Sequence, residues 1–321
     1  MKRRLLLSGL LAPATLRAQD APWPSRGVTV IVPFAPGSSS DIIARATAPV
    51  LSAALGQPFV VENRPGATGE VGARQVIRSA PDGHMLMHAP ISTWAINVAL
   101  RPNLGYDPVT QLTRISQTVR TPNVLVVNPQ KVPVRDLPSF IAWLKANPRE
   151  ASYSSSGIGS SDHLTGAMFA LATGLDLVHV PFTGGAPATT AVIAGDVAFS
   201  FQNLGSIVPH IRDNRVRSIF ITSQARHPLL PEVPVAGEVG LSDFVVYSWQ
   251  ALGGPGGMAP ALAARVHAAF RTALLSREVK ARMDDIGFDV VASTPAEFAA
   301  FQAGEIERWS RVVRAGNIKA E

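Results

Sequence analysis

The sequence predicts an α/β fold of two βαβ domains that are joined by a hinge of two crossovers. Short apolar runs alternate with helical stretches along the chain, which is the pattern of a mainly parallel sheet whose strands are connected by helices. The length of 321 residues exceeds that of most single domains. Hydrophobic residues make up 46% of the chain and charged residues 16%, which is enough apolar material for a sizeable core.

The first 18 residues have the pattern of a secretory signal peptide. Charged residues at Lys2–Arg4 precede a short apolar run from Leu5 to Leu16, and Ala18 is the expected cleavage site. The run is too short to cross a bilayer whose apolar core is about 30 Å thick. We therefore expect residues 1–18 to be removed when the chain is exported.

The charge balance argues against a nucleic-acid partner. The net charge of +6 falls to +2 without residues 1–18, because this segment holds four basic residues and no acidic ones. No block of Lys and Arg remains after it. The chain also has no cysteine, which excludes a disulfide, a thiol nucleophile and a cysteine-based metal site.

The first predicted domain begins with the clearest strand of the chain, Val28–Phe34, which is rich in β-branched residues. A helix is predicted at Ile42–Leu55, where apolar residues recur at helical spacing and Gly56 ends the pattern. Turn residues separate the elements that follow. These are predicted strands at Phe59–Val61 and Met85–His88 and a predicted helix at Glu70–Ser79.

The second predicted domain, residues 123–246, repeats this alternation. Glycines that follow the helical patterns are expected to end them. The predicted strands are Asn123–Val127, Ser152–Ser155, Val178–Val180, Val197–Phe201 and Val216–Ile221, and the predicted helices are Asp136–Ala146, Asp162–Thr173, Ala188–Ala194 and Ser206–Asp213.

The chain is then predicted to return to the first domain. Val245–Gly253 is a predicted strand, and Pro260–Leu275 and Pro295–Val313 are predicted helices that begin with proline. The first domain is therefore discontinuous and comprises residues 19–122 and 247–321. Two crossings between the domains would form a hinge about which they close.

Three times in the chain a strand ends, a loop of small residues follows and a helix begins. This happens at Phe34–Asp41, at Ser154–His163 and, more weakly, at Pro181–Pro187. The first N–H groups of a helix have no acceptor within the helix, and the helix dipole makes this end partly positive. Small residues let a ligand approach the backbone. Two such helix ends that face each other would bind a carboxylate without any Arg or Lys.

The same residue types are also ordinary turn and N-cap residues. Asp41 in particular is placed where a cap for its helix is expected. One such loop alone is therefore weak support for a site. Two of them, one in each predicted domain, favour a ligand site between the domains.

Five segments resemble, in the same order, those of one protein family. Phe34–Asp41 resembles F-x-P-G-G-x-x-D, Val61–Gly69 resembles V-E-N-R-P-G-A-x-G, and Ala80–Leu86 resembles A-P-D-G-Y-T-L. Ser154–Leu164 resembles S-S-G-x-G-S-x-x-H-L, and His179–Gly184 resembles H-V-P-Y-K-G. The chain thus resembles the Bug, or TctC-like, substrate-binding proteins of tripartite tricarboxylate transporters over nearly all of its mature length.

The resemblance implies a periplasmic type-II solute-binding protein fold that closes around its ligand. It implies an extracytoplasmic receptor, not an enzyme, which binds a small carboxylate and delivers it to the membrane permease subunits of such a transporter. We expect a monomer with no cofactor and no metal. The residues implied to line the cleft are Phe34, Gly37, Ser38, Ser39, Asp41, Ser92, Thr93, Gly159, Ser160, Ser161, His163, Thr183, Gly184, Gly185, Ala186, Gln202 and Asn203.

The chain departs from the family pattern in three places. Ser38 stands where a second glycine is usual, which adds a hydroxyl donor or alters the local backbone. Phe182-Thr183 replaces the usual Tyr-Lys. Gln202-Asn203 stands where Asp-Asn is common, and the loss of a carboxylate there disfavours a ligand that carries an ammonium group.

Two alternatives stay open. A sensory co-receptor would have the same fold and ligand but a membrane signalling partner. An exported hydrolase would need an activated nucleophile, and Ser160 and His163 have no orienting acid or G-x-S-x-G motif beside them. His84 and His88 lack a third ligand for a metal. Trp249, near the second crossover, is a candidate for the cleft wall, whereas the other tryptophans are expected in the core.

Overall fold

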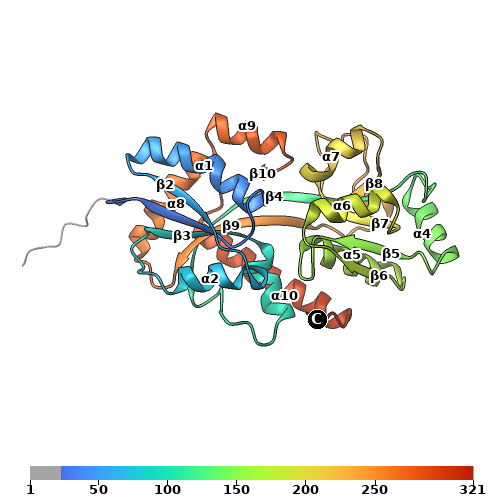
Figure 1. Cartoon of the computed structure of the whole chain (residues 1–321), viewed down its shortest axis with the longest axis horizontal. Helices are drawn as coiled ribbons and strands as arrows, with labels where there is room; N and C mark the ends of the chain where they lie inside the picture. Colours follow the sequence, from blue (N-terminus) through green and yellow to red (C-terminus); the bar gives the residue numbers. More distant parts are fainter. Residues whose placement is uncertain (1–22, 321) are drawn as a thin grey trace, which may run out of the picture.

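The computed structural model describes residues 23–320, so the predicted signal peptide lies outside the described residues. Two groups of strands lie next to each other along the long axis of the molecule, with helices packed around each group (Figure 1). All strands join in one ten-stranded sheet of order β2-β1-β3-β9-β4-β7-β5-β6, in which β8 and β10 also pair with β4. The predicted α/β fold is confirmed. Among the described residues, no helix is both long and apolar enough to cross a membrane.

The elements follow one another in the alternation that the sequence predicts. The strands are β1 (Val28–Val32), β2 (Phe59–Asn63), β3 (Met85–Pro90), β4 (Leu112–Val127), β5 (Ser152–Ser155), β6 (Val178–Pro181), β7 (Phe199–Asn203), β8 (Arg217–Ile221), β9 (Tyr247–Pro255) and β10 (Asp289–Val290). The α-helices are α1 (Ser39–Leu55), α2 (Glu70–Ile77), α3 (Asn97–Leu100), α4 (Leu137–Ala146), α5 (Ser161–Thr173), α6 (Gly185–Ala194), α7 (Leu204–Arg212), α8 (Pro260–Leu274), α9 (Arg277–Asp285) and α10 (Pro295–Ala315).

In the first group of strands, β1 lies between β2 and β3 and runs parallel to both. In the second group, β5 lies between β6 and β7 and is again parallel to both. Parallel strands end at the same edge of a sheet, and ligands of such sheets bind outside these carboxyl ends. Each group therefore gathers three strand-to-helix loops at one edge.

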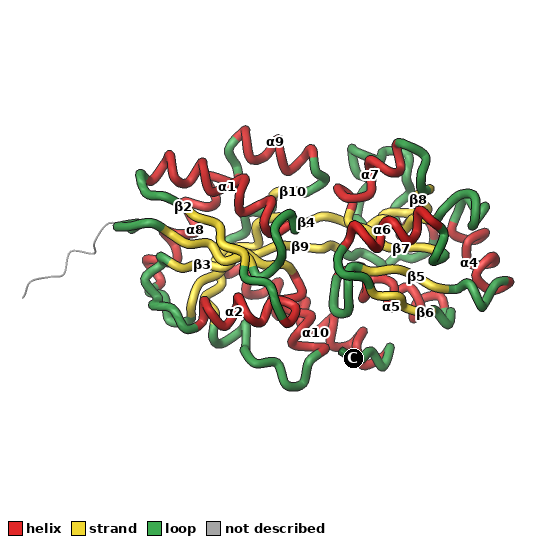
Figure 2. The backbone as a smooth tube through the Cα atoms, viewed as in Figure 1, coloured by secondary structure: helices red, strands yellow, loops and turns green. Residues whose placement is uncertain are grey.

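β4 is long enough to belong to both groups. Its residues Leu112–Pro122 pair with β9, and its residues Asn123–Val127 pair with β7 and β8. The chain returns to the first group just before β9, which begins at Tyr247. Figure 2 shows β4 and β9 as the strands that run between the two groups.

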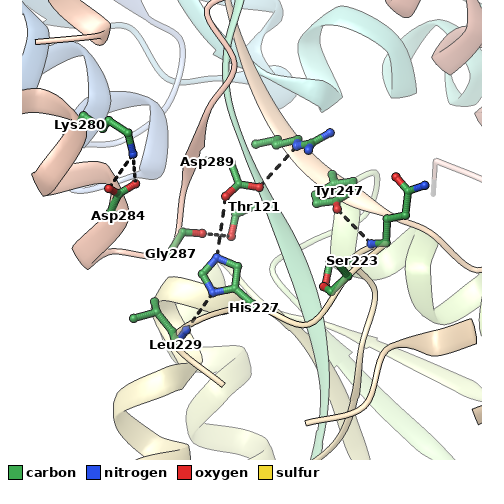
Figure 3. Close-up of polar contacts among 12 residues, drawn as sticks. Thr121, Ser223, His227, Leu229, Tyr247, Lys280, Asp284, Gly287 and Asp289 are labelled. Atoms are coloured by element: carbon green, nitrogen blue, oxygen red, sulfur yellow. Dashed lines mark hydrogen bonds and ion pairs between the residues drawn. The ribbon is translucent and has the colours of Figure 1, made fainter. Parts of the chain in front are cut away.

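Polar contacts also join the two groups of strands beside the point where β4 and β9 run between them (Figure 3). The Gln224 N–H, in the loop after β8, donates to the Tyr247 hydroxyl at the start of β9 (3.1 Å). His227 of the same loop lies 3.9 Å from the carboxylate of Asp289 in β10. Burial lowers the pKa of His227, although the charge of Asp289 opposes this. The contact at neutral pH is therefore made by a neutral imidazole.

The core of the first group contains three fully buried tryptophans, Trp94, Trp249 and Trp309. Glu305 of α10 accepts hydrogen bonds from the indole N–H of Trp249 (2.8 Å) and of Trp309 (3.0 Å). Phe298 packs edge-on against Trp94 and Trp249. Trp249 is therefore a core residue, and its candidacy for the cleft wall is wrong.

Some elements differ from the sequence-based expectation for local reasons. α1 begins at Ser39 rather than Ile42, because Ser38 takes the N-cap position. β4 begins at Leu112, well before Asn123, because pairing with β9 makes a strand of residues that lack strict alternation. α9 follows the N-cap Ser276, which accepts a hydrogen bond from the Val279 N–H. Its charged sequence gives a weak apolar pattern, and no helix is predicted there.

Candidate functional site

Loops at the strand ends of the two groups face each other in the middle of the molecule (Figure 2). Gly159, after β5, lies against α3 of the other group, since a Cβ at this position would be 3.1 Å from Leu100. Within the first group, Gly69, after β2, lies against Thr93 and the ring of Phe34. The loop after β2 therefore contacts the loop after β1 and the segment after β3. This segment in turn contacts the loop after β5, which belongs to the other group of strands.

The loop after β1 is closed by a carboxylate in the first turn of α1. The Gly37 N–H donates to Asp41 Oδ2 (2.9 Å), while Arg45 Nε and Asn63 Nδ2 both donate to Asp41 Oδ1 (2.9 Å each). Burial by itself would raise the pKa of Asp41, but these hydrogen bonds and the Arg45 charge hold it below its ordinary value. Both oxygens of the ionised carboxylate are thus engaged by protein donors, and Asp41 supports the loop.

This support leaves other donors of the loop free. The first helical hydrogen bond of α1 runs from the Ile42 N–H to Ser38 O. The amides of Ser39, Ser40 and Asp41 therefore have no acceptor within the helix. Ser38 Oγ is buried and has no hydrogen-bond partner among residues 23–320. The start of α1 thus combines unpaired amides with an unpaired hydroxyl.

α1 is fixed to the sheet at this same end. Ser40 Oγ donates to Gln250 Oε1 of β9 (2.5 Å), and Ser40 O accepts from His88 Nδ1 of β3 (3.1 Å). Burial lowers the pKa of His88 to about 4, so the ring is neutral near pH 7. Because Nδ1 faces a carbonyl oxygen, it carries the ring proton. The amide donors of α1 are therefore held in place before any ligand arrives.

The loop after β5 is built in the same way. Asp162, in the first turn of α5, accepts from the Ser156 N–H (2.6 Å) and from Ser156 Oγ (2.8 Å). Burial raises the pKa of Asp162, and the hydrogen bonds from Ser160 and Ser156 oppose this in part. In each of the two loops, an aspartate in the first turn of the following helix accepts hydrogen bonds from the loop and closes it.

Ser160 is the N-cap of α5. Its Oγ accepts from the His163 N–H (3.3 Å) and donates to Gly157 O (2.6 Å). The first helical hydrogen bond runs from the Leu164 N–H to Ser160 O, so the amides of Ser161 and Asp162 have no acceptor within the helix. The hydroxyl of Ser160 points to a backbone carbonyl and not to an imidazole, which is unlike an activated nucleophile.

Two stacked histidines lie behind this loop. His163 Nδ1 accepts from the Gly159 N–H (3.1 Å), and its ring stacks on His179 with 3.8 Å between the centroids. His179 Nε2 in turn lies 2.6 Å from Ser155 Oγ. Burial lowers the pKa of His163 to about 3, helped by the neighbouring His179, and lowers that of His179 to about 4. Neutral His163 therefore positions Gly159.

The loop after β2 contains a left-handed turn beside the site. Ala67 and Thr68 have φ angles of 46° and 52°, which residues with a side chain rarely adopt. Asn97 Nδ2 donates to Thr68 O (3.0 Å), and Arg101 Nη2 donates to Thr68 Oγ1 (3.1 Å). Strained backbone of this kind often occurs at ligand sites. The segment after β3 thus holds the turn in place.

The predicted residues of the second group's other loops lie at the starts of α6 and α7. Thr183, Gly184, Gly185 and Ala186 form the loop after β6 and the first turn of α6. A Cβ at Gly185 would be 3.7 Å from Gln202 Oε1, so this loop lies next to the end of β7. Asn203 is the N-cap of α7, and its Oδ1 is buried without a partner among the described residues.

A set of buried polar side-chain atoms has no hydrogen-bond partner within the described part of the protein. Native structures have few of these. Residues 23–320 contain nine such side-chain atoms, and seven of them belong to the strand-end loops or to the segments packed against these loops. They are Ser38 Oγ, Thr93 Oγ1, Trp94 Nε1, Asn97 Oδ1, Arg101 Nε, Asn123 Oδ1 and Asn203 Oδ1.

Sequence reasoning missed Asn97, Arg101 and Asn123. Each is a common polar residue in a helix, loop or strand, with no motif around it. Only packing against segments distant in the sequence buries Asn97, Asn123 and the Nε atom of Arg101. Of the predicted residues, Ser92 is also buried, in the turn that follows β3. No group of three potential metal ligands occurs within the described part of the chain.

Comparisons with known proteins agree with this architecture. Residues 43–318 match the family described as "Tripartite tricarboxylate transporter family receptor". Protein BugT of Bordetella pertussis is 34% identical over 313 residues, which cover 97% of this chain and 94% of that protein.

Two solved structures have the same fold. MatC of Rhodopseudomonas palustris, with bound malate, is 33% identical with a TM-score of 0.81 over 91% of this chain and all of that one. R. palustris Rpa4515, with adipate, is 30% identical with a TM-score of 0.85 over 92% of this chain and 99% of that one. These relatives are binding proteins and not enzymes. The chain belongs to the TctC family of tripartite tricarboxylate transporter receptors, as a solute receptor.

Proposed function

We propose that this receptor binds a small carboxylate between the loops after β1 and β5 and delivers it to the permease subunits of a tripartite tricarboxylate-type transporter. The unpaired amides at the starts of α1 and α5 are the observation that supports this most directly. Helix N-termini favour anions through their N–H groups and dipole. The malate and adipate bound to the two R. palustris relatives support the same ligand class.

The two carboxylates in the first turns of α1 and α5 are both bonded to their own loops, which leaves other donors of these helix starts for an anion. Asp41 and Asp162 lie in the first turns of α1 and α5, and both accept hydrogen bonds from their own loops. Ser38 Oγ and Thr93 Oγ1 add hydroxyls that have no partner among the described residues. The remaining predicted residues, from Phe34 to Asn203, would shape the rest of the cleft.

We propose that residues 19–122 with 247–321 and residues 123–246 are two domains that close on the ligand. The strands β4 and β9 would form the hinge, because they alone among the described strands connect the two groups. Closure would bring the two helix N-termini onto the same carboxylate and present one shape to the permease. Residues 1–18 would direct the chain to the periplasm.

A thermal-shift screen with C3–C6 mono-, di- and tricarboxylates, and with sugars, tests the proposal. A ligand at 100 times its dissociation constant should add about 2.7 kcal/mol to the free energy of unfolding. We expect stabilisation by at least one acid and by none of the sugars. Stabilisation by a sugar, with none by the acids, would refute the ligand class.

A further inference from the structure

His227 lies between the two groups of strands, beside the strands of the proposed hinge. It belongs to the loop after β8, in the second group, and its Nε2 atom lies 3.9 Å from Asp289 Oδ1 of β10, in the first group (Figure 3). β10 pairs with β4 at Arg120, next to the point at which β4 passes into the second group. The side chain of His227 is only 12% exposed. A change in its charge therefore acts where the two groups would rotate.

A closed series of contacts passes through the hinge strands at this point. Arg120 Nε lies 3.5 Å from Asp289 Oδ2, and the guanidinium lies over the ring of Tyr247 in β9 (4.4 Å). The Tyr247 hydroxyl accepts from the Gln224 N–H (3.1 Å), which belongs to the same loop as His227. We call these five residues the hinge clasp. Because its members come from both groups, rotation of the groups must change these contacts.

Hydrogen bonding selects the neutral form of His227. Its Nδ1 accepts from the Leu229 N–H (3.2 Å), so the ring proton lies on Nε2, the atom nearest to Asp289. A second proton would have to bind Nδ1 and would turn this acceptor into a donor. The Leu230 N–H is also bonded to His227 O (2.9 Å), so the bond that is lost belongs to a tight turn. Protonation therefore weakens the local structure that holds the ring against β10.

The charged groups around His227 do not fully compensate an added proton. They are arranged in pairs of opposite sign, namely Asp289 with Arg120 (3.5 Å), Asp284 with Lys280 (2.8 Å) and Arg226 with Glu238 (3.1 Å). An imidazolium there would lie next to carboxylates that already have a positive partner. Burial lowers the pKa of His227, although the charges of Asp289 and Asp284 oppose this.

We propose that His227 makes the hinge clasp sensitive to acid: the neutral ring keeps the loop after β8 against β10, and protonation releases it, so that the ligand is held less tightly in acid. This inference rests on the proposed function, because it takes closure of the two groups as the step that retains the ligand. The balance between approached and separated groups sets the apparent affinity. A ring that binds a proton more readily when the groups separate shifts this balance towards separation as the pH falls.

Titration calorimetry at pH 7.5 and 5.5, with malate and with adipate as probes, tests the inference. We expect the affinity of the wild-type chain to fall at least about threefold more between these pH values than that of His227→Gln, which cannot titrate at this position. Protonation of the probe is common to both chains and cancels. His267→Gln is the matched control, because His267 Nε2 lies 3.0 Å from Ser293 O within the first group. It should respond to pH as the wild type does.

Small-angle scattering of the chain without ligand separates this inference from the proposed function. We expect the radius of gyration to rise from pH 7.5 to 5.5 in the wild type and in His267→Gln, and to stay constant in His227→Gln. Failure of both acids to bind would count against the proposed ligand class, and scattering would then decide the inference by itself. Equal responses of the wild type and His227→Gln in every measurement, or tighter binding by the wild type alone at pH 5.5, would overturn it.

Asp289→Asn then tests the charge across the clasp. This variant removes a carboxylate that favours the protonated ring, so the loss of affinity between pH 7.5 and 5.5 should become larger than in the wild type. The double variant with His227→Gln should lose this added pH dependence. A smaller pH response of Asp289→Asn than of the wild type would overturn the role of Asp289.

Discussion

At the scale of single residues, the loop after β5 depends on a glycine at which a side chain would be in tight contact with the other group. Gly159 has a φ of 80°, and a Cβ there would be 3.1 Å from Leu100 of the opposing group. Its N–H is bonded to neutral His163, which fixes the loop from behind. The position thus combines a left-handed backbone with a tight contact across the interface.

Gly159→Ala should weaken carboxylate binding about tenfold while the chain still folds. The added methyl group strains the left-handed backbone and pushes the loop away from α3. Gly174→Ala is the matched control, because Gly174 also has a positive φ of 65° but has nothing within 4 Å of its Cβ position. Calorimetry should show weaker binding for the first variant only. Equal loss of affinity in both would show that the contact with α3 does not matter.

The buried histidines predict how stability depends on pH. The pKa of His88 and of His179 is lowered to about 4 and that of His163 to about 3, whereas an unfolded histidine has a pKa of about 6.5. Between about pH 6.5 and 4 the unfolded chain binds more protons than the folded chain. The free energy of unfolding should therefore be fully retained above pH 6.5 and fall as the pH drops through this range.

Urea unfolding between pH 4.5 and 7.5 measures this slope. His88→Gln should flatten it, because one group that protonates only in the unfolded chain is removed. A slope that His88→Gln does not alter would assign the pH dependence to other groups.

At the scale of elements, α10 is tied to the sheet by one carboxylate. Glu305 accepts the indole N–H groups of Trp249 in β9 and of Trp309 in α10 itself. Both indoles are fully buried, so neither nitrogen can turn to water instead. The helix also begins with a capping box between Thr294 and Glu297. The packing of α10 on β9 therefore depends on a side chain in the middle of the helix.

Glu305→Ala should lower the free energy of unfolding by about 2–4 kcal/mol, since it leaves two buried donors unpaired. Glu305→Gln keeps an acceptor oxygen and should cost clearly less. Denaturant titration of both variants separates the hydrogen bonds from the packing of the side chain. Equal destabilisation by the two substitutions would show that the indole hydrogen bonds contribute little.

At the scale of the whole molecule, the two groups of strands also touch at the start of α7. A Cβ at Gly205 would overlap the carbonyl oxygen of Ile286, which follows α9 in the other group. The loop of Gly159 and the first turn of α7 at Gly205 thus make two separate contacts between the groups. Close approach at both depends on a glycine.

Gly205→Ala should act as a wedge between the two groups. We expect a larger radius of gyration by small-angle scattering in the presence of ligand, and weaker binding, because the groups cannot come as close. Gly237→Ala is the control, since nothing lies within 4 Å of its Cβ position. An unchanged radius of gyration and an unchanged affinity for Gly205→Ala would mean that the backbone around Gly205 and Ile286 can move apart without affecting ligand binding.

The sequence by itself determined the α/β alternation, most element positions and the two loops around Gly37 and Ser160. Local chemistry carries this information: β-branched runs form strands, helical spacing forms helices, and Gly/Ser loops precede helix starts. The order of five short segments was enough to indicate the family. Positions such as Ser152–Ser155 match the observed strand β5 fully.

Only the tertiary structure decided which polar atoms lack partners. Asn97 begins α3 and Arg101 follows this helix, whereas Asn123 lies in β4. Their unpaired atoms are buried by packing against segments that no local pattern connects to them. The same holds for Trp249, which a position near the crossover made a candidate for the cleft and which packing places in the core. A hydrogen bond that is missing can be recognised only when every neighbour is known, because water satisfies such groups wherever they are exposed.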